Sequence, residues 1–305
     1  MRLLTRSDFD GLACGTILKH LGIIDSWKFV HPKDVQDGIV EVTKDDVLAN
    51  IPYVEGCALW FDHHSSEEER LGNSIIQFEG ESRRADSAAR VVFEYYNGKE
   101  RAPEFEEMLR AVDKVDAAKL SIDDIDNPSG WVLLGFIMDP RTGLGRFRNF
   151  RISNYDLMEK LIDACANSSI DEILADPDVR ERVDLYFVQN DLFKRMVKEQ
   201  TRVDGNVIIT DLRGIETIYS GNRFIVYTLC PEQNISLWVT DGREQKNCAI
   251  AIGHSITNRT SKTNVGKLAL KFGGGGHNQV GTCQVPYDQA DAAIAEIVAK
   301  AKADG

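Results

Sequence analysis

The sequence predicts an α/β protein with two domains joined by a long helix. Its first 65 residues alternate strand-like and helix-like runs, an order typical of a parallel, doubly wound sheet. Residues 176–203 have the pattern of one long helix, and β-rich runs follow it. Since 305 residues are enough for two domains, we expect an N-terminal domain at 1–175, a linker helix at 176–203 and a smaller C-terminal α/β domain at 204–305.

The elements of the first domain follow from hydrophobic periodicity. Strands are predicted at RLLT (2–5), WKFVHP (27–32), DVLANIP (46–52) and CALWFDHH (57–64). Helices are predicted at LACGTILKHLG (12–22), ADSAARVVFEYYNG (85–98), PEFEEMLRAVDKVDAAKL (103–120) and NYDLMEKLIDACA (154–166). The stretch 127–151 lacks a regular pattern, and we expect it to be irregular.

The long helix has a recognisable start. Asp176 is a suitable cap, Pro177 suits the first helical position, and apolar residues recur at helical spacing after it. The C-terminal domain is then predicted to contain strand-like runs at VIITDL (207–212), FIVYTL (224–229), SLWVT (236–240) and CAIAIG (248–253). A glycine run and an alanine-rich helix complete it.

Charge and cysteine usage limit the function. The net charge of −12 disfavours a protein that grips long nucleic acid, because such proteins need many lysine and arginine contacts to phosphates. The six cysteines form no C-x-x-C pair, which indicates neither a zinc knuckle nor a disulfide scaffold. With no apolar leader and no run of 18 apolar residues, we expect a cytoplasmic protein without a membrane partner.

Acidic and imidazole side chains follow two of the predicted strands. Asp8 and Asp10 flank Phe9, and residues two apart on an extended chain point the same way. His63 and His64 follow Asp62 at the end of another apolar run. Each motif alone also fits a polar turn, but together they offer oxygen and nitrogen ligands that suit manganese, iron or magnesium.

The glycine run GGGGH (273–277) is a second candidate site. Backbone without side chains lets N–H groups approach a phosphate closely, and His277 adds a donor. A flexible turn is the alternative interpretation.

These motifs resemble those of the DHH–DHHA1 phosphoesterases. This superfamily includes RecJ-type exonucleases, short-oligonucleotide phosphodiesterases and cyclic dinucleotide phosphodiesterases. SDFDG (7–11) resembles the first motif, FDHH (61–64) the third, and VGKLALKFGGGGHNQVG (265–281) the signature of the C-terminal substrate-binding domain. The resemblance covers nearly the whole chain and is strongest to the exopolyphosphatase-related group.

The resemblance implies roles for individual residues. The implied metal ligands are Asp8, Asp10, His63 and Asp116, with Asp113 as an alternative to Asp116 and Asn50 as a weak candidate. The implied catalytic residues are His64 and His277, which stabilise phosphoryl charge, and Asp62, which orients a ligand. The implied substrate contacts are Gly274, Gly275, Gly276 and His277. Arg259 is a further candidate, and Arg146 and Arg148 are candidates because of their local positive charge.

Two positions depart from the family pattern. Leu4 stands where the family usually has a histidine. The strand before DHH normally ends in an aspartate that bridges two metals, and here the candidates are Asn50 near its end and Asp45 or Asp46 near its start. We therefore expect one intact metal site (Asp10, His63, Asp116) and one impoverished site.

The segment RTGLGRFRNFR (141–151) is a local positive island in an acidic chain. Arginine pairs with phosphates and aromatic rings stack on bases, so this segment is a candidate for handling a nucleotide. The alternative is that its arginines pair with nearby carboxylates.

The sequence thus predicts a manganese-dependent phosphodiesterase acting on short oligonucleotides or dinucleotides, with Mg²⁺ or Fe²⁺ as alternative ions. An exopolyphosphatase or nucleoside-phosphate phosphatase is a second hypothesis. A nucleotide-binding module with a decayed metal site is a third. The expected partner is a small phosphate-containing substrate, and the oligomeric state, including a homodimer, is left open.

Overall fold

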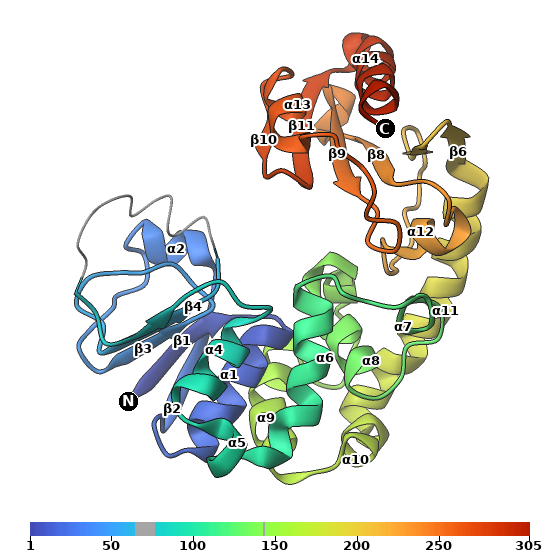
Figure 1. Ribbon diagram of the computed structural model, residues 1–305. Helices are drawn as coiled ribbons and strands as arrows, with labels where there is room; N and C mark the ends of the chain where they lie inside the picture. Colours follow the sequence, from blue (N-terminus) through green and yellow to red (C-terminus); the bar gives the residue numbers. More distant parts are fainter. Residues whose placement is uncertain (65–76, 143) are drawn as a thin grey trace. The chain divides into compact units, whose positions relative to one another are not determined.

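The computed structural model describes residues 1–64, 77–142 and 144–305 (Figure 1). The chain divides into two compact units. The first comprises Met1–Lys119 and Pro128–Leu185, and the second comprises Leu120–Asn127 and Tyr186–Gly305. The division falls inside one long helix, α11 (Pro177–Gln200). The domain limits at residues 175 and 204 stay a prediction.

A five-stranded parallel sheet forms the centre of the first unit. Its strand order is β2-β1-β3-β4-β5. The strands are β1 (Arg2–Arg6), β2 (Ser26–Val30), β3 (Asp46–Ala49), β4 (Leu59–Asp62) and β5 (Gly80–Ser82). This order reverses between β1 and β3, and open parallel sheets bind ligands beyond the carboxyl ends of the strands at such a switch point. The predicted N-terminal fold class is therefore confirmed.

Both faces of this sheet are covered. Leu3 and Leu4 are fully buried neighbours on β1, so they point to opposite faces. Leu4 packs with Val35 of α2 (Pro32–Gln36) in one apolar cluster. Leu3 lies on the face of α1 (Phe9–His20), where a Cβ at Gly15 would contact it.

A layer of helices surrounds α1. The larger ones are α4 (Ala88–Tyr95), α6 (Glu106–Asp116), α8 (Gly130–Met138) and α9 (Asn154–Asn167). Shorter ones are α5 (Gly98–Arg101) and α10 (Ile170–Ala175), with 3₁₀ turns at Pro103–Phe105, Pro140–Thr142 and Leu144–Arg146. The short helix α7 (Ile122–Asp126) belongs to the second unit.

The helix α8 corrects the prediction of an irregular stretch at 127–151. Residues Val132–Met138 are all buried, so this helix is apolar on every side. An amphipathic period does not arise in such a helix, and hydrophobic periodicity cannot reveal it.

The second unit contains a six-stranded sheet with the order β10-β11-β9-β8-β7-β6. The strands are β6 (Thr201–Asp204), β7 (Val207–Asp211), β8 (Ile235–Asp241), β9 (Asn247–His254), β10 (Gly275–Gly276) and β11 (Val280–Pro286). Only β7 and β8 pair in parallel among these described strands. Apolar residues of one sheet face form a core with α13 (Val265–Leu270) and α14 (Ala290–Asp304).

The run FIVYTL is helical, so its strand prediction was wrong. It forms α12 (Ile225–Leu229). Asn222 starts the turn: its side chain accepts from Phe224 N at 3.0 Å and its carbonyl accepts from Ile225 N at 3.1 Å. A turn directly before the helix thus overrides the β-propensity of this run. None of the described helices is long and apolar enough to cross a membrane.

Candidate active site

Asp8 caps the first helix of the chain. Strand β1 ends at Arg6, and the Asp8 carboxylate accepts a hydrogen bond from Gly11 N at 2.9 Å. A Cβ at Gly11 would lie 2.0 Å from the carbonyl oxygen of Arg6, so only glycine fits this turn. The expectation that Asp8 and Asp10 share one face of an extended strand was wrong, because Asp10 already lies in the first turn of α1.

Asp10 is fixed by the N-terminus of a second helix. Its two carboxylate oxygens accept hydrogen bonds from Ala88 N at 2.9 Å and from Ala89 N at 2.8 Å, in the first turn of α4. Only 2% of its surface is exposed. Burial raises the pKa of Asp10 well above its usual range, and the negative charges of Asp116 and Asp8 raise it further. An ionised Asp10 in this position therefore needs a nearby positive charge.

The imidazole of His63 has a defined tautomer. Its Nδ1 lies 3.3 Å from the carbonyl oxygen of Ala85. A carbonyl oxygen can only accept, so Nδ1 carries the proton and Nε2 carries a lone pair. Burial is the main cause that lowers the pKa of His63, which favours this neutral form.

The free nitrogen of His63 faces two carboxylates. Nε2 lies 3.2 Å from Oδ2 of Asp116 and 3.7 Å from Oδ2 of Asp10. It is buried, and no described residue donates a hydrogen bond to it. Oxygen and nitrogen lone pairs that point at one another are repulsive unless a cation or a proton lies between them.

One ligand atom from each of Asp10, His63 and Asp116 lies within 4.8 Å of the other two. Two carboxylates and one imidazole suit manganese, iron, magnesium or zinc, and the absence of thiolate from this set disfavours softer ions. The neutral imidazole, its orientation by Ala85 and the excess of buried negative charge all fit a divalent cation.

The structure distinguishes the two aspartates of α6. Asp113 accepts hydrogen bonds from Arg90 Nη2 at 2.7 Å and from Ser87 Oγ at 2.7 Å. These bonds hold α6 against the start of α4. Asp116 instead belongs to the group with His63, as its motif position suggested.

Asp62 and His64 form a separate pair. The buried Asp62 accepts from His64 Nδ1 at 2.8 Å, so the Nε2 of His64 is the nitrogen available to a ligand. Burial opposes ionisation of His64, but the hydrogen bond and the charge of Asp62 outweigh it and raise the pKa. Asp62 was expected to orient a metal ligand. It contacts His64 instead, and Ala85 orients His63.

Asn50 lies across the topological switch point from Asp8. Its Nδ2 donates to Oδ1 of Asp8 at 3.0 Å, and Asn50 adopts a left-handed backbone with φ of 56°. Arg6 pairs with the other oxygen of Asp8 at 3.1 Å. Burial raises the pKa of Asp8 to about 6. Three donors thus contact the Asp8 carboxylate, two at Oδ1 and one at Oδ2, and its role as a metal ligand stays a prediction.

The remaining candidates for the second motif lie elsewhere. Asp46 stands at the opposite end of β3, where it accepts from Arg2 Nε at 2.6 Å. Asp45 is exposed beside it. Leu4 packs in the apolar cluster of α2. Asn50 is therefore the residue of this strand that contacts the first motif.

The glycine run of the second unit is partly a strand. Gly275 and Gly276 form β10 and pair with β11. Gly274 N donates to Ala269 O at 3.0 Å, and His277 N donates to Val280 O at 2.7 Å. The amides of Gly274 and His277 are thus already bonded within the protein. The exposed ring of His277 and the exposed backbone of β10 are the groups open to a ligand.

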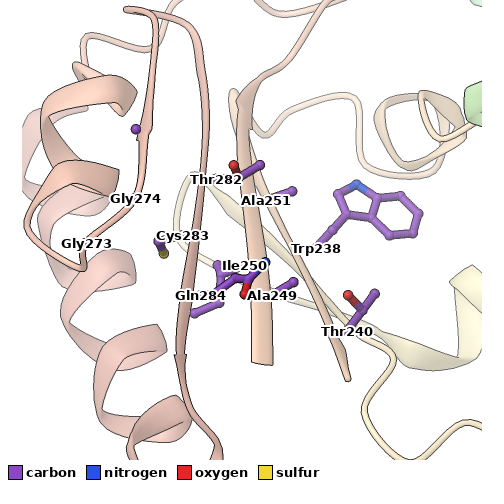
Figure 2. Close-up of a pocket in the computed structure, with 11 residues that line it drawn as sticks. Trp238, Thr240, Ala249, Ile250, Ala251, Gly273, Gly274, Thr282, Cys283 and Gln284 are labelled. Carbon is purple, nitrogen blue, oxygen red and sulfur yellow. The ribbon is translucent and has the colours of Figure 1, made fainter. Parts of the chain in front are cut away.

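A cavity of about 530 Å³ lies beside this run, on the sheet face opposite the apolar core (Figure 2). Trp238 and Thr240 reach it from β8, and Ala249 and Ala251 reach it from β9. Trp238 stacks on Phe193, with ring centroids 6.0 Å apart and planes at 11°. Small side chains next to an indole leave room for a planar group.

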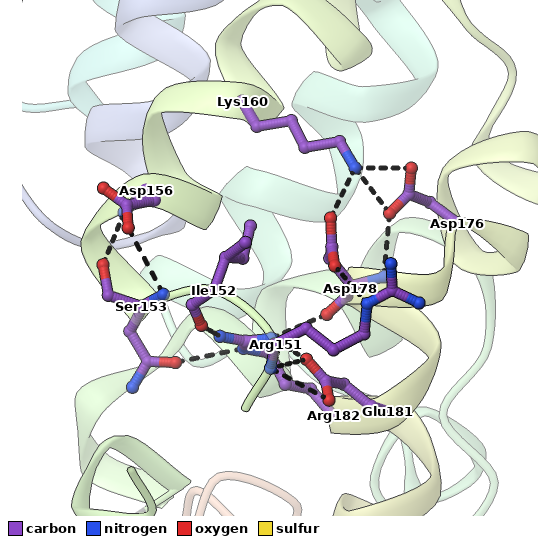
Figure 3. A network of polar contacts seen from close by, with 10 residues as sticks. Arg151, Ile152, Ser153, Asp156, Lys160, Asp176, Asp178, Glu181 and Arg182 are labelled. Carbon is purple, nitrogen blue, oxygen red and sulfur yellow. Dashed lines mark hydrogen bonds and ion pairs between the residues drawn. The ribbon is translucent and has the colours of Figure 1, made fainter. Parts of the chain in front are cut away.

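The arginines at 141–151 divide into different environments. Arg151 contributes to a polar network with the start of α11, where its Nε lies 3.2 Å from Asp178 and its backbone N donates to Glu181 at 3.0 Å (Figure 3). Arg141 Nη2 pairs with Asp139 at 2.8 Å. The alternative of pairing with nearby carboxylates therefore holds for these two.

Arg146 and Arg148 are exposed, and Arg146 lies over the ring of Phe147 at 5.6 Å. In the second unit, Arg259 is also exposed, and its Nε donates to Ile256 O at 3.2 Å. The substrate-binding roles of these three arginines stay predictions.

The sequence motifs did not reveal several groups that shape the site. These are the carbonyl of Ala85, the amides of Ala88 and Ala89, and the guanidinium of Arg6. A partial signal existed, because Ser87 is a good N-cap and predicts a helix start with free amides at 88 and 89.

Comparison with solved structures finds a relative over the full length. The pGpG-specific phosphodiesterase PggH from Vibrio cholerae is 48% identical, and the match covers 100% of this chain and 99% of that chain with a TM-score of 0.89. A DHH domain from a protein described as belonging to a family of ribosomal proteins matches 98% of this chain and 85% of its own length. At 12% identity and a TM-score of 0.55, that second likeness is one of fold alone. No protein-family model matches the chain, and no curated protein matches it.

An identity of 48% over 100% of this chain and 99% of the relative is far above the level of a shared fold. The hypothesis of a binding module without activity is therefore wrong, and the protein is a phosphoester hydrolase. Its motifs, its parallel sheet and this relative agree: the chain belongs to the DHH–DHHA1 phosphoesterase superfamily.

Proposed function

We propose that this enzyme is a divalent-cation-dependent phosphodiesterase that cleaves short oligonucleotides, with the dinucleotide pGpG as its preferred substrate and Mn²⁺ as its preferred ion. The observation that carries the proposal is the full-length identity to a pGpG-specific phosphodiesterase. The convergence of Asp10, His63 and Asp116 supports it, since the ligand set fits the ion that such chemistry needs.

Three side chains would hold the ion: Asp10, His63 and Asp116. When bound there, a divalent cation supplies Lewis acidity toward a phosphoryl oxygen and favours ionisation of water at neutral pH. The amides of α4 keep Asp10 in place, and Ala85 keeps the lone pair of His63 directed at the same point. These contacts lower the reorganisation needed to bind the ion.

His64 would act on the substrate. Asp62 holds the proton on Nδ1, so Nε2 can donate to a non-bridging phosphate oxygen when the ring is doubly protonated. A charge-assisted hydrogen bond of this kind strengthens as negative charge accumulates on the phosphoryl group. We also propose His277 as a substrate contact contributed by the second unit.

A single ion is the expected stoichiometry. The carboxylate of Asp8 is engaged by Arg6, Asn50 and Gly11, and Leu4 offers no ligand atom. Asn50 is neutral, so it would bind a second ion more weakly than the aspartate of the family pattern.

The test is a turnover screen with purified protein and Mn²⁺ over pGpG, pApA, cyclic dinucleotides, 3′-phosphoadenosine 5′-phosphate and polyphosphate. We expect the highest kcat/KM for pGpG and loss of turnover in His63→Ala. Faster hydrolysis of polyphosphate than of any dinucleotide would contradict the proposal and favour an exopolyphosphatase.

A further inference from the structure

A smaller cavity of about 220 Å³ lies within the first unit, beside the first motif. Ser7, which directly precedes Asp8, lines it. Asp139 lines it from the end of α8, Phe150 from the segment before α9, and Asn154 from the start of α9. The cavity therefore borders the turn that carries the site residues.

Arg141 connects this cavity electrostatically to the metal-binding side chains. Its guanidinium pairs with Asp139, which lines the cavity. Burial opposes ionisation of Arg141, but Asp139 and the charges of Asp116 and Asp8 raise its pKa. Arg141 thus pairs with a residue that lines the cavity and interacts electrostatically with two residues of the candidate active site.

The cavity has the size and lining of a pocket for one ring. Sites for drug-sized ligands usually measure about 300–1,000 Å³, so 220 Å³ suits a part of a nucleotide. Met138, Leu144 and Met158 give it apolar walls, and Phe150 adds an aromatic surface. Apolar walls with a few polar groups are typical of a site for a planar base and atypical of a phosphate site.

A buried arginine makes this pocket rigid. Arg182 is 1% exposed, and its guanidinium lies 4.0 Å from the centroid of the Phe150 ring. It donates to Ile152 O at 2.8 Å and to Oδ1 of Asn154 at 3.0 Å (Figure 3). Phe150 and Asn154 are thus held in place before any ligand binds.

The polar groups of the pocket offer one acceptor and two donors. The carboxylate of Asp139 is the acceptor, and it is shared with Arg141, which donates to Oδ1 from its backbone N at 2.8 Å and pairs with Oδ2 through Nη2 at 2.8 Å. Because Oδ1 of Asn154 accepts from Arg182, its Nδ2 amino group is left as a donor, and no acceptor for it occurs among the described residues. Arg148 is exposed at the pocket and has no ion pair with the described part of the chain.

We propose that this cavity, lined by Ser7, Asp139, Arg148, Phe150 and Asn154, binds the guanine base of the substrate and selects guanine over adenine. The proposal rests on the proposed function, since it places one base of the dinucleotide beside the reaction centre. Guanine has N–H donors that match Asp139 and the acceptors O6 and N7 that match Asn154 and Arg148. Adenine has an amino group in place of O6, which leaves a donor of the pocket unpaired.

The main variant is Asn154→Asp. A carboxylate at this position still accepts from Arg182, and an acid in the first turn of α9 is favourable for the helix. The substitution therefore keeps the bond to Arg182, removes the amino donor and adds one negative charge. Arg148→Ala removes the second donor. Arg180→Ala is the matched control, because Arg180 is an exposed arginine of the same unit paired with Asp184 outside the pocket.

The experiment measures kcat/KM of the Mn²⁺ enzyme on pGpG and pApA, together with bis(p-nitrophenyl) phosphate, which has no base. We expect Asn154→Asp to lower the ratio of pGpG to pApA about tenfold, mainly through KM, and Arg148→Ala to lower it several-fold. Hydrolysis of the ester without a base should fall much less than that of pGpG in both variants, and Arg180→Ala should behave as wild type. An unchanged ratio in both pocket variants would overturn the proposal, and so would an equal loss on all three substrates.

A binding measurement separates this inference from the proposed function. Calorimetry with guanosine 5′-monophosphate needs no turnover, and we expect Asn154→Asp to weaken its binding about tenfold relative to wild type. Equal affinity for adenosine and guanosine monophosphates in wild type would overturn the pocket assignment even in an active enzyme. Failure of wild type to hydrolyse any phosphodiester, with guanine binding intact, would overturn the proposed function alone.

Discussion

The Nε2 atom of His63 lies 3.2 Å from a carboxylate oxygen of Asp116, and the other ring nitrogen faces the carbonyl of Ala85. This arrangement places a lone pair against a carboxylate in a buried setting. It is stable with a cation or a proton between the two groups and unfavourable without either. Metal binding should therefore depend on Asp116.

Replacing Asp116 by Asn should remove metal binding, whereas the same change at Asp113 should not. Asp116 contributes a charged ligand atom to the group with His63, and Asp113 pairs with Arg90 instead. Both residues lie on α6, so each variant is a control for the other. Manganese content after dialysis should fall close to zero in Asp116→Asn and stay near the wild-type value in Asp113→Asn. Equal metal loss in the two variants would show that the effect arises from the helix and not from a ligand.

The variant Asn50→Asp should make the protein less stable without metal and more stable with it. An aspartate tolerates the left-handed backbone of Asn50, but its charge would face that of Asp8 across 3.0 Å. We expect the melting temperature of the metal-free variant to drop by several degrees and excess Mn²⁺ to restore it. Wild type should show one tight ion per chain under the same conditions. A second tight ion in wild type would contradict our assignment of Asn50 and Leu4.

Asp46 should stabilise the fold through its pair with Arg2. Its carboxylate is buried and accepts from Arg2 and from the backbone and side chain of Thr43. Burial opposes its ionisation, but these bonds outweigh it and lower the pKa. Asp46→Asn should cost about 2 kcal/mol of unfolding free energy at pH 7, and the exposed neighbour Asp45→Asn less than about 0.5 kcal/mol.

The stabilisation that Asp46 provides should decrease as the pH is lowered. A carboxylate whose folded pKa lies below its unfolded value contributes its full stability above about pH 4 and loses it as the pH falls through the folded pKa. The difference in unfolding free energy between wild type and Asp46→Asn, measured with urea, should therefore decrease as the pH is lowered from about 7 toward about 3. A difference in unfolding free energy that increases on acidification would refute the stabilising role of the pair of Asp46 and Arg2.

His277→Ala should weaken catalysis without changing metal content. The ring of His277 is exposed in the second unit, and its backbone amide is already bonded to Val280. Loss of a charge-assisted hydrogen bond should lower kcat/KM for dinucleotides, by an amount that corresponds to about 1–3 kcal/mol of lost transition-state stabilisation. Elemental analysis should give the wild-type metal content. Loss of metal together with activity would contradict the separate roles of the two units.

Substrates of about two to five nucleotides should be preferred over long strands, since a binder of long strands needs a basic track. The chain has a net charge of −12, and two of the four arginines at 141–151 are paired with carboxylates. The double variant Arg146→Ala with Arg148→Ala should raise KM for short substrates more than it lowers kcat. A length series at fixed salt checks both statements. Equal kcat/KM on strands of about thirty nucleotides would refute the length preference.

Much of the fold could be predicted because the apolar runs and the helix-start signals in the sequence agree with the strands and helices that form. The central strands of the first unit are buried apolar runs, and Asp176 and Pro177 mark the start of α11. Prediction failed where the pattern was ambiguous. Helix α8 is apolar on all sides, and the FIVYTL run forms a helix that follows a turn at Asn222.

The candidate site could be predicted by residue type but not by geometry. The motifs named Asp10, His63 and Asp116, and these three side chains do converge. The partner of Asp62 could not be predicted, because adjacent histidines offer two equivalent choices in sequence. The contact of Ala85 with His63 involves a backbone carbonyl, which carries no sequence signal.

The most direct test of this account is a titration of metal-free protein with Mn²⁺ while the turnover of pGpG is measured. We predict no turnover without metal, and a rise in turnover that saturates at one ion per chain in wild type and does not occur in His63→Ala. Turnover of pGpG that is independent of metal, or undiminished in His63→Ala, would contradict it.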